Sequence, residues 1–582
     1  MNSTASPLPA RQRKQALVLF ALIFALCLPS LWAGMMGDDY MHYAIFEADS
    51  LPIEKPDDLS LFGLFSFING DPDRNRQAMD LGVIPWWTYS GMKYAFWRPI
   101  AEVTHWIDYQ LWPRMPSLMH LHNLLWYLGI CFLLLKLYRR TLPTAPVALI
   151  ALALYGLDAT HGFAISWIAN RNGLIAAFFG MAAFLTYIRW REDQGSHWQG
   201  LSLLLLLAAL LSAEIGISTF GYLAAYAWCC DPKGRAKGIL ALLPHAGVII
   251  VWYAVYKLAG FGAANADAYY VDPAAQPLTF LEQFGQRFIV LLGSQWGIIP
   301  AELYGYGATK TTNYVIGCLV YLLLILPTVW FLTRKHAYTQ MWLLGMLCSL
   351  VPATTALPQD RVLIFAGIGA SAALAHFLYI VFSQFRHMDL QAKWLFKTIG
   401  SILVLFHLVI SPLLLPVATY STRLFWSAMI SQGPSQFPDI EDLQNKRLVI
   451  VGAPLASSLA IAPFRFHRGE PIPRNIWILS TIDEAINFRR LSDTTIEATL
   501  PGGFIQGPEK AVRDFARFPF SEGESVKLSG ITIRIAELNV SGMPQKLILE
   551  FDESTELEDV IFLKWNNQSK SYNGIDVSNG IQ

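Results

Sequence analysis

The sequence predicts an α-helical polytopic membrane protein with about eleven transmembrane helices and a small β-rich C-terminal domain on the outer face. Of its 582 residues, 54% are hydrophobic and 15% are charged, which excludes an ordinary soluble multidomain enzyme. The charges are also unevenly distributed, because 36 of the 163 residues from 420 to 582 are charged, against 50 of the first 419. We therefore predict a transmembrane domain over residues 1–419 and a mostly β domain over residues 420–582.

The charge balance and the cysteines exclude several other classes. The formal net charge is zero, so the composition does not indicate nucleic acid or another polyanion as a partner. The six cysteines lie in or beside apolar stretches, and their spacing indicates neither a disulfide framework nor a zinc motif.

The transmembrane prediction comes from apolar runs bounded by charged residues. A helix needs roughly 20 apolar residues to cross the hydrocarbon core. The long stretch from Gly200 to Cys230 is divided at Ser212-Ala213-Glu214, because one crossing does not use that length. The predicted segments lie near residues 15–33, 120–137, 145–162, 173–189, 200–213, 215–230, 238–258, 313–333, 339–353, 361–382 and 395–416.

Basic residues give the predicted topology. Lys and Arg concentrate in cytoplasmic loops. With eleven crossings and a cytoplasmic N-terminus, every basic cluster between the segments falls on the cytoplasmic side. The same alternation places the first loop, residues 34–119, and the C-terminal domain on the outer face. Within that loop, residues 83–112 are rich in Trp and Tyr, including Trp86-Trp87, and we expect them at the level of the lipid headgroups.

After Ser421 the pattern changes to short β-rich runs separated by Gly and Pro, which predicts a small β domain. No recognisable catalytic motif accompanies these runs. The runs are Arg447–Val451, Asn475–Leu479, Thr494–Leu500, Ser525–Glu537, Gln545–Phe551 and Val560–Trp565.

An acidic motif, Gly37-Asp38-Asp39, follows the first predicted segment directly. Adjacent carboxylates repel each other, so one of them tends toward a raised pKa and can act as a base on a hydroxyl. If a helix begins at Gly37, Asp38 and His42 share a face and both carboxylates lie at the positive helix end. The alternative is a helix cap, because Asp is a favoured capping residue.

Three arginines lie on the same predicted side: Arg98, Arg171 and Arg361. Guanidinium groups bind phosphate through paired donors, so together they suit a phosphate-bearing substrate. Taken singly, each arginine fits an interfacial side chain or the partner of a nearby Asp better than a phosphate ligand. Two further polar residues interrupt apolar surroundings: His161 at the end of the third segment and Glu214 at the break between the fifth and sixth.

These motifs together resemble the C-type glycosyltransferase superfamily, GT-C, in its branch of protein O-mannosyltransferases and cadherin-directed transmembrane mannosyltransferases. The resemblance covers roughly residues 15–380. It rests on the order and spacing of the matching motifs, which are Gly37-Asp38-Asp39, Trp97-Arg98-Pro99-Ile100, Asp108-Tyr109-Gln110-Leu111-Trp112, His120-Leu121-His122-Asn123-Leu124-Leu125, Asn170-Arg171-Asn172-Gly173-Leu174, Ser212-Ala213-Glu214 and Asp360-Arg361.

The resemblance implies an inverting glycosyltransferase that uses a polyprenyl-phosphate sugar as donor. Asp38 would deprotonate the acceptor hydroxyl and Asp39 would orient it. The three arginines would hold the leaving phosphate, and His42, His161 and Glu214 would complete the substrate site. A lipid-phosphate leaving group needs no nucleotide, in agreement with the absence of a Gly-rich phosphate loop from the sequence.

The sequence also departs from the family pattern. Ser212-Ala213-Glu214 stands where Ser-Lys-Glu is usual, and Asp360-Arg361 stands where Glu-Arg is commoner. Neither a repeat array nor a β-trefoil insert is visible. The acceptor, which is a glycan, a lipid or a protein, therefore does not follow from the resemblance.

The resemblance further implies a bacterial inner membrane, with the C-terminal domain in the periplasm and a role in cell-envelope glycans. We expect no obligatory metal, although Asp57-Asp58 and Asp71 with Asp73 could bind a divalent cation. Two other functions remain open: a flippase or transporter of a lipid-linked glycan, and a catalytically silent membrane scaffold.

Overall fold

The computed structural model describes residues 9–47, 63–266, 269–297, 299–305, 308–384, 390–429, 437–454, 461–569 and 571–577. The chain forms two compact units. The membrane unit comprises Met1–Met35, Trp97–Gly260 and Gln276–Arg423. The C-terminal unit comprises Met36–Phe96, Phe261–Ala275 and Leu424–Gln582. Most of residues 34–119, the predicted first outer loop, thus belongs to the same unit as the C-terminal strands, and so does the acidic motif.

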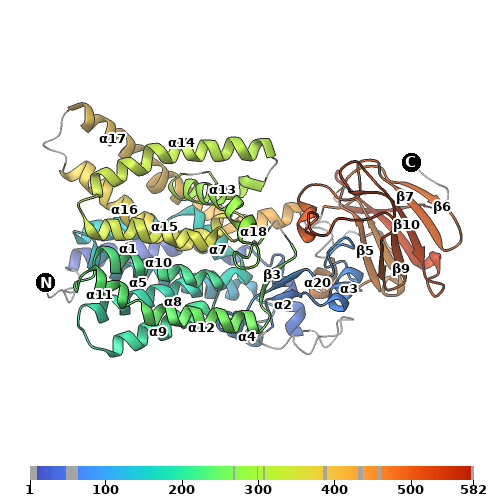
Figure 1. The fold of residues 1–582 in the computed structure, drawn as a ribbon, viewed down its shortest axis with the longest axis horizontal. Coiled ribbons are helices and arrows are strands. Elements are labelled where there is room, and N and C mark those ends of the chain that lie inside the picture. The colour runs from blue at the N-terminus through green and yellow to red at the C-terminus, as the bar shows by residue number, and fades with distance from the viewer. Residues whose placement is uncertain are drawn as a thin grey trace. The chain divides into compact units, whose positions relative to one another are not determined.

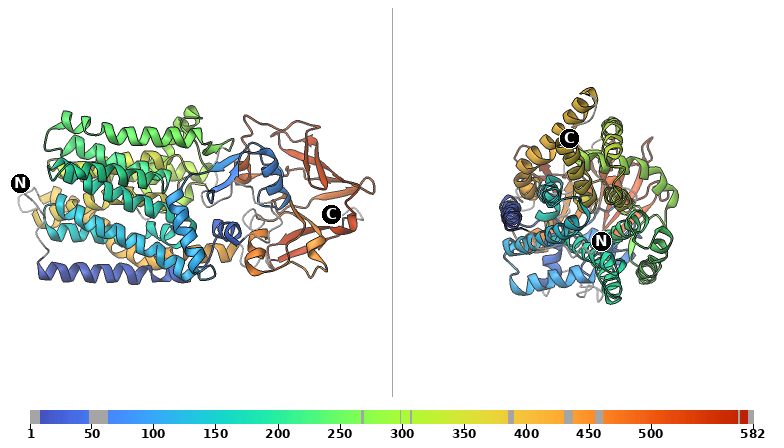
Figure 2. Two further views of the ribbon diagram at one scale, coloured as in Figure 1. Left: turned by 90° about the horizontal axis from the view of Figure 1, so that it is seen from below. Right: turned by 90° about the vertical axis from the view of Figure 1, so that its left-hand side faces the viewer.

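The membrane unit is a bundle of helices, most of which run roughly parallel or antiparallel to one another (Figures 1 and 2). Each apolar segment expected from the sequence is mainly helical. The α-helices of this unit are α1 (Ala10–Cys27), α4 (Pro99–Leu111), α5 (Pro116–Thr141), α6 (Ala145–Gly156), α7 (Gly162–Ser166), α8 (Arg171–Arg191), α9 (His197–Leu210), α10 (Ser218–Cys229), α11 (Arg235–Leu240), α12 (Leu243–Leu258), α13 (Pro277–Trp296), α14 (Ala308–Thr333), α15 (Ala337–Ala353), α16 (Ala366–Tyr379), α17 (Leu390–Val404) and α18 (Ser411–Met429).

Among the described residues, seven helices are long and apolar enough to cross a membrane, or eight if the bent pair formed by α6 and 159–166 counts as one span. The predicted count of eleven is therefore not confirmed. The physical reason is length: α9, α10 and α15 have 14, 12 and 17 residues. At 1.5 Å per residue these helices measure about 18–26 Å, less than the hydrocarbon thickness of about 30 Å.

Helix α16 lies at the centre of the bundle because its residues are small. The span that contains it is largely buried inside the membrane unit, whereas the spans of α1 and α14 are largely exposed. A Cβ atom added at Gly369 would lie 2.3 Å from the carbonyl oxygen of Trp342 in α15. Glycine at this position therefore permits the two helices to pack closely, as small residues do in membrane helices.

The C-terminal unit contains three sheets. The strand orders are β1-β2-β3, β12-β11-β4-β5 and β6-β7-β10-β9-β8. The unit also holds helices α2 (Asp38–Glu47), α3 (Pro72–Asp80) and α20 (Ile461–Arg468). The strands are β1 (Ser66–Asn69), β2 (Lys93–Ala95), β3 (Gly262–Ala264), β4 (Arg447–Val451), β5 (Asn475–Ser480), β6 (Asn487–Arg490), β7 (Thr495–Thr499), β8 (Ser525–Leu528), β9 (Ile531–Leu538), β10 (Pro544–Phe551), β11 (Val560–Asn566) and β12 (Ser571–Ile575).

The six β-rich runs expected from the sequence all form strands, so the β-rich C-terminal domain is confirmed. The four-stranded sheet is mixed, because β4 pairs in parallel with both β5 and β11. Helix α20 lies between β4 and β5 in the sequence and connects them as the crossover of a βαβ unit.

The segment predicted as the first outer loop contributes to the hydrophobic core of the C-terminal unit. Trp86 and Trp87 are 1% and 0% exposed and belong to a cluster that includes Trp477. The Trp86 indole N–H donates to the carbonyl oxygen of Leu479 at 3.1 Å. These two tryptophans therefore pack in a protein core, which differs from the contact with lipid headgroups expected from the sequence.

Candidate functional site

The two adjacent aspartates of the acidic motif have different environments. Asp39 is 1% exposed, and its Oδ2 accepts a hydrogen bond from the backbone N–H of Met36 at 2.9 Å. Asp38 begins helix α2 and is half-buried. Asp39 therefore stabilises the turn before the helix, and Asp38 is the more accessible carboxylate. Asp39 is not the N-cap residue, because it lies in the first turn of α2 and its carboxylate reaches back to a residue before the helix, as the acidic residue of a capping box does.

His42 lies on the same helix and is fully buried among aromatic rings. Its ring stacks on Phe67, with centroids 5.7 Å apart, and meets Phe65 edge-on at 5.0 Å. Both phenylalanines come from the segment that forms β1. The expected spacing of Asp38 and His42 on one helix is thus present, and the histidine packs against this segment.

Arg98 and Glu214 form an ion pair in the membrane unit. The guanidinium donates from Nε at 2.9 Å and from Nη2 at 2.7 Å, both to Oε2 of Glu214. The two side chains are 14% and 28% exposed, so the pair is partly open. The two residues were predicted as separate parts of the site, and the structure brings them together.

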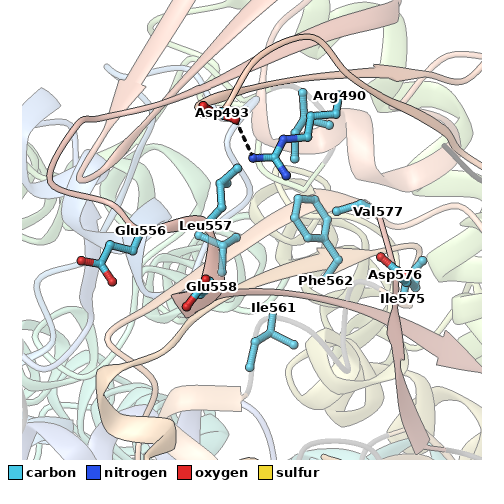
Figure 3. Close-up of a pocket in the computed structure, with 12 residues that line it drawn as sticks. Arg490, Asp493, Glu556, Leu557, Glu558, Ile561, Phe562, Ile575, Asp576 and Val577 are labelled. Atoms are coloured by element: carbon cyan, nitrogen blue, oxygen red, sulfur yellow. Dashed lines mark hydrogen bonds and ion pairs between the residues drawn. The ribbon is translucent and has the colours of Figure 1, made fainter. Parts of the chain in front are cut away.

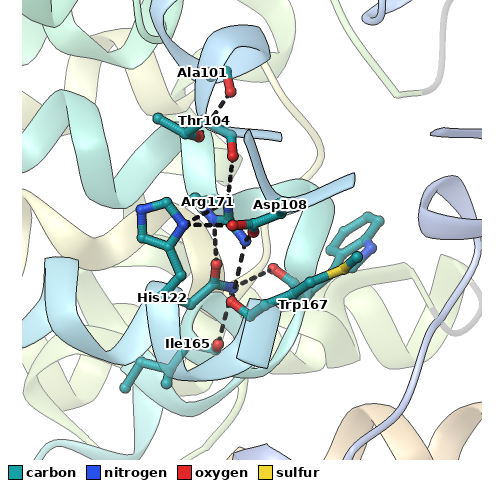
Figure 4. A network of polar contacts seen from close by, with 9 residues as sticks. Ala101, Thr104, Asp108, His122, Ile165, Trp167 and Arg171 are labelled. Atoms are coloured by element: carbon teal, nitrogen blue, oxygen red, sulfur yellow. Dashed lines mark hydrogen bonds and ion pairs between the residues drawn. The ribbon is translucent and has the colours of Figure 1, made fainter. Parts of the chain in front are cut away.

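Arg171 is fully buried and forms an ion pair with Asp108, which is also fully buried (Figure 4). Its Nε donates to Oδ1 of Asn123 at 2.5 Å. Nη1 and Nη2 donate to the carbonyl oxygens of Thr104 at 3.2 Å and Met119 at 3.0 Å. This guanidinium therefore ties α4, α5 and α8 together, and its burial differs from the direct phosphate contact expected from the sequence.

The same network includes His122, whose Nδ1 lies 2.8 Å from Oδ1 of Asp108 and 3.2 Å from Nη1 of Arg171. The sequence analysis named Asp108 only as part of a motif. Its charge opposite Arg171 is the signal that would have identified this pair, since a buried arginine requires an anionic partner.

Arg361 joins two of the sequence motifs. Its Nη1 donates to Oδ1 of Asn170 at 3.1 Å, and its guanidinium lies over the Trp167 ring, 4.8 Å from the centroid. Nε donates to Gln359. Nη2 makes no hydrogen bond to any residue that the structure describes, so this nitrogen has donors available for a ligand.

The turn that carries Arg361 is held by two carboxylates: Asp360, which the sequence showed only as part of a motif, and Glu302, which was not predicted. Oδ1 of Asp360 accepts from the Ser294 hydroxyl at 2.7 Å and from the Ala301 N–H at 2.9 Å. In return, the Asp360 N–H donates to Oε1 of Glu302 at 2.9 Å. Burial raises the pKa of both carboxyl groups. The charge of Glu302 raises the pKa of Asp360 further, whereas the hydrogen bond from the Asp360 N–H acts to lower the pKa of Glu302.

His161 is fully buried and lies within a group of tyrosines. Its Nδ1 is 3.0 Å from the Tyr127 hydroxyl and 3.1 Å from the carbonyl oxygen of Tyr155. Because it is enclosed by helices α5 and α6, its surroundings fit a packing role in the bundle rather than the substrate contact that the sequence predicted.

Of the residues proposed as alternative metal ligands, Asp57-Asp58 lies outside the residues that the structure describes. Asp71 and Asp73 form contacts within the protein. Asp71 accepts from the backbone N–H groups of Asp73 and Arg74 at 2.9 Å each, which caps helix α3. Across the described parts of the chain, no group of three or more His, Cys, Asp or Glu side chains is arranged to hold a metal ion.

A separate cavity of about 600 Å³ lies in the C-terminal unit (Figure 3). Arg490, which forms an ion pair with Asp493 at 3.1 Å, lines one side. Phe562 and other apolar residues line it as well, and further carboxylates are Glu556, Glu558 and Asp576. An excess of carboxylates repels anions, so this cavity is unsuited to a phosphate group.

Comparisons with known proteins support the motif-based resemblance. No family model matches the chain. The chain is 28% identical over 133 residues to the protein O-mannosyl-transferase TMTC3 of Homo sapiens, and equally to TMTC3 of Mus musculus. Each match spans 22% of this chain and 14% of the relative's length. The resemblance to this branch, which the motifs predicted, is thereby confirmed.

Solved structures of ArnT from Cupriavidus metallidurans are also similar to the chain. The structure bound to undecaprenyl phosphate is 12% identical, with 93% of this chain and 98% of that chain covered and a TM-score of 0.37. The apo structure is 13% identical, with 80% and 86% covered and a TM-score of 0.37.

Proposed function

We propose that this chain is a GT-C membrane glycosyltransferase that moves a sugar, with inversion, from a polyprenyl-phosphate donor to an acceptor on the periplasmic face of a bacterial inner membrane. The observation that carries the proposal is the unequal environment of Asp38 and Asp39. Asp39 is buried and accepts a backbone hydrogen bond, whereas Asp38 is half-buried at the start of a helix. A general base must reach the acceptor hydroxyl, which favours the more exposed of the two carboxylates.

In the proposed reaction, Asp38 removes the proton from an acceptor hydroxyl. The acceptor oxygen attacks the anomeric carbon of the sugar, and the bond between that carbon and the phosphate oxygen breaks. The products are the glycosylated acceptor and polyprenyl phosphate. Inversion follows from this single displacement, and the developing charge on the phosphate requires cationic stabilisation.

Arg98 and Arg361 are the proposed phosphate-binding residues. Arg98 is partly open in its pair with Glu214, and Arg361 has an available Nη2. Arg171 is assigned a positioning role, because its contacts with Asp108, Asn123 and backbone carbonyls occupy its donors. The similarity to a protein O-mannosyl-transferase makes mannose the first sugar to test.

Sugar transfer by the purified protein in lipid tests the proposal. The donors are radiolabelled polyprenyl-phosphate sugars, beginning with mannose, and the acceptors are an envelope extract. We expect transfer by the wild type and a loss of at least 100-fold in Asp38→Asn, because general-base catalysis contributes about 10²–10⁴-fold. Asp193→Asn is the matched control, since Asp193 is an exposed partner of Lys233 and its backbone has a φ of 60°, which Asn also tolerates.

The rival functions give different results. A flippase moves the labelled lipid across the bilayer without releasing sugar, and a scaffold does neither. Retained transfer in Asp38→Asn, with a fold like that of the wild type, would exclude Asp38 as the base. No release of sugar from any donor by the wild type would exclude the glycosyltransferase itself.

A further inference from the structure

Helix α2 packs inside the C-terminal unit on two sides, through His42 near the side of Asp38 and through Tyr40 and Tyr43 on the opposite side. At 3.6 residues per turn, His42 lies about 40° around the helix from Asp38, whereas Tyr43 and Tyr40 lie about 140° and 200° away. Tyr40 and Tyr43 are 8% and 3% exposed. The two tyrosines therefore form the back of the helix relative to Asp38.

Helix α20 packs against this back face, and the two helices lie side by side in the C-terminal unit (Figure 1). The His467 ring meets Tyr40 with centroids 5.3 Å apart and Tyr43 with centroids 4.8 Å apart, both edge-on. Phe464 meets the Tyr40 ring at 5.3 Å, again edge-on. Edge-to-face pairs at these distances are the favoured geometry for aromatic side chains.

The other face of α20 is fixed to the sheet of its βαβ unit. Ile461 and Ala462 are 0% and 2% exposed and belong to a core cluster with Leu448 of β4 and Ile476 of β5. The helix thus has one face in the core of the C-terminal unit and the other against α2. A rigid element placed behind a side chain restricts the movement of that side chain's helix.

We propose that α20, through the rings of His467 and Phe464, positions the acidic helix so that Asp38 is held in its reactive orientation. His467 is a positioning residue, since it contacts the back of the helix and not the carboxylate. The C-terminal unit is consequently part of the catalytic apparatus, with its βαβ crossover supporting the base. This inference rests on the proposed function, because it takes Asp38 as the base.

The test compares His467→Ala with His467→Phe in the full-length protein in lipid, using radiolabelled polyprenyl-phosphate mannose and an envelope extract. We expect kcat to fall about 10-fold or more in His467→Ala, since small displacements of a catalytic group cost up to about 100-fold. The KM for the donor should stay within about twofold of the wild type, and His467→Phe should restore most of kcat, because it keeps the ring.

Matched variants separate positioning from loss of fold. His197→Ala removes a histidine ring that contacts Trp198 in the membrane unit, 4.9 Å between centroids, and should leave kcat unchanged. If His467→Ala does not fold, Phe464→Leu removes the ring from Tyr40 while keeping an apolar side chain, and it should show the same fall in kcat at unchanged KM. Size-exclusion profiles and thermal midpoints establish that each compared variant is folded.

The outcomes distinguish this inference from the proposed function. If the wild type and all variants fail to transfer sugar, the proposed function fails and the inference with it. If the wild type is active, Asp38→Asn is inactive and folded His467→Ala equals the wild type, the proposed function stands and the positioning role is overturned. Equal losses of kcat in folded His467→Ala and His467→Phe would also overturn the positioning role, because the aromatic ring at position 467 would then not account for the wild-type kcat.

Discussion

Arg98 and Glu214 are joined by two hydrogen bonds to a single carboxylate oxygen, at 2.9 and 2.7 Å. Glu214 lies at the start of the short 3₁₀ turn Glu214–Ile217, between α9 and α10, and Arg98 immediately precedes α4. The break in the long apolar stretch from Gly200 to Cys230 therefore presents a carboxylate that fixes the orientation of a partly open guanidinium.

Replacing Arg98 by Lys should weaken donor binding. Lysine keeps the charge but loses the planar set of donors that can bind Glu214 and a phosphate together. A hydrogen bond to a charged group contributes about 1.5–3 kcal/mol, so we expect the KM for the polyprenyl-phosphate sugar to rise about 10-fold or more. Arg489→Lys, in an exposed pair with Glu497, is the control and should leave KM unchanged. An unaltered KM in Arg98→Lys would argue against phosphate binding there.

Replacing Arg171 by Met should destabilise the membrane unit. The change leaves the buried Asp108 carboxylate without its cation, which costs about 3–5 kcal/mol in soluble proteins. The thermal midpoint in detergent measures the effect. In the double variant Arg171→Met with Asp108→Leu, the thermal midpoint should fall by less than the sum of the falls in the two single variants, because neither charge then remains buried alone. Additive losses would show that the pair is not coupled.

Replacing Asp80 by Ala should destabilise the C-terminal unit. Oδ1 of Asp80 accepts from the Trp477 indole N–H and the Ser529 N–H, both at 2.9 Å. Trp477 is buried, and its indole N–H left unsatisfied costs about 1–3 kcal/mol. Hydrogen exchange of β5 and β8 should therefore accelerate. Asp73→Ala, on the same helix but in an exposed pair with Arg76, should change stability by less than about 1 kcal/mol.

The Glu302 and Asp360 carboxyl groups should make stability depend on pH. Burial raises the pKa of Asp360, and the nearby Glu302 charge raises it further. The folded state therefore holds its proton at pH values where the unfolded state has lost it. The contribution of protonated Asp360 to the free energy of unfolding is complete below the pKa that this group has in the unfolded chain. It is lost as pH rises through the higher pKa of the folded state. Thermal midpoints between pH 4 and 9 should fall less with rising pH in Asp360→Asn than in the wild type.

Local patterns predicted much of the C-terminal unit. Every run that was predicted from its apolar pattern became a strand, although Ser525–Glu537 is in fact the hairpin of β8 and β9, which turns at Ser529-Gly530 with a Gly530 φ of +95°. Helix α20 was not predicted, because eight residues with an internal proline give too short a periodic pattern. Strands β6 and β12 were missed because they are polar and largely exposed along one side.

The site residues were identified more easily than their environments. Charges in an apolar sequence singled out Asp38, Arg98 and Arg361, but sequence spacing could not reveal that Arg171 is buried against Asp108, which is distant in the chain. The predicted number of spans was not confirmed for a related reason. An apolar run indicates burial but does not give the length of a helix, and α10, which packs against α15, has only 12 residues.

The C-terminal unit is built from three separate stretches of chain, and this affects the order in which it can fold during synthesis. Residues 36–96 leave the ribosome before most of the membrane helices, whereas α20 and the strands that complete their core, including β11, are made after those helices. The core around the acidic helix can therefore form only after the helices of the membrane unit have been made. A chain that terminates within the membrane unit would contain the acidic helix without α20 and strands β4 to β12.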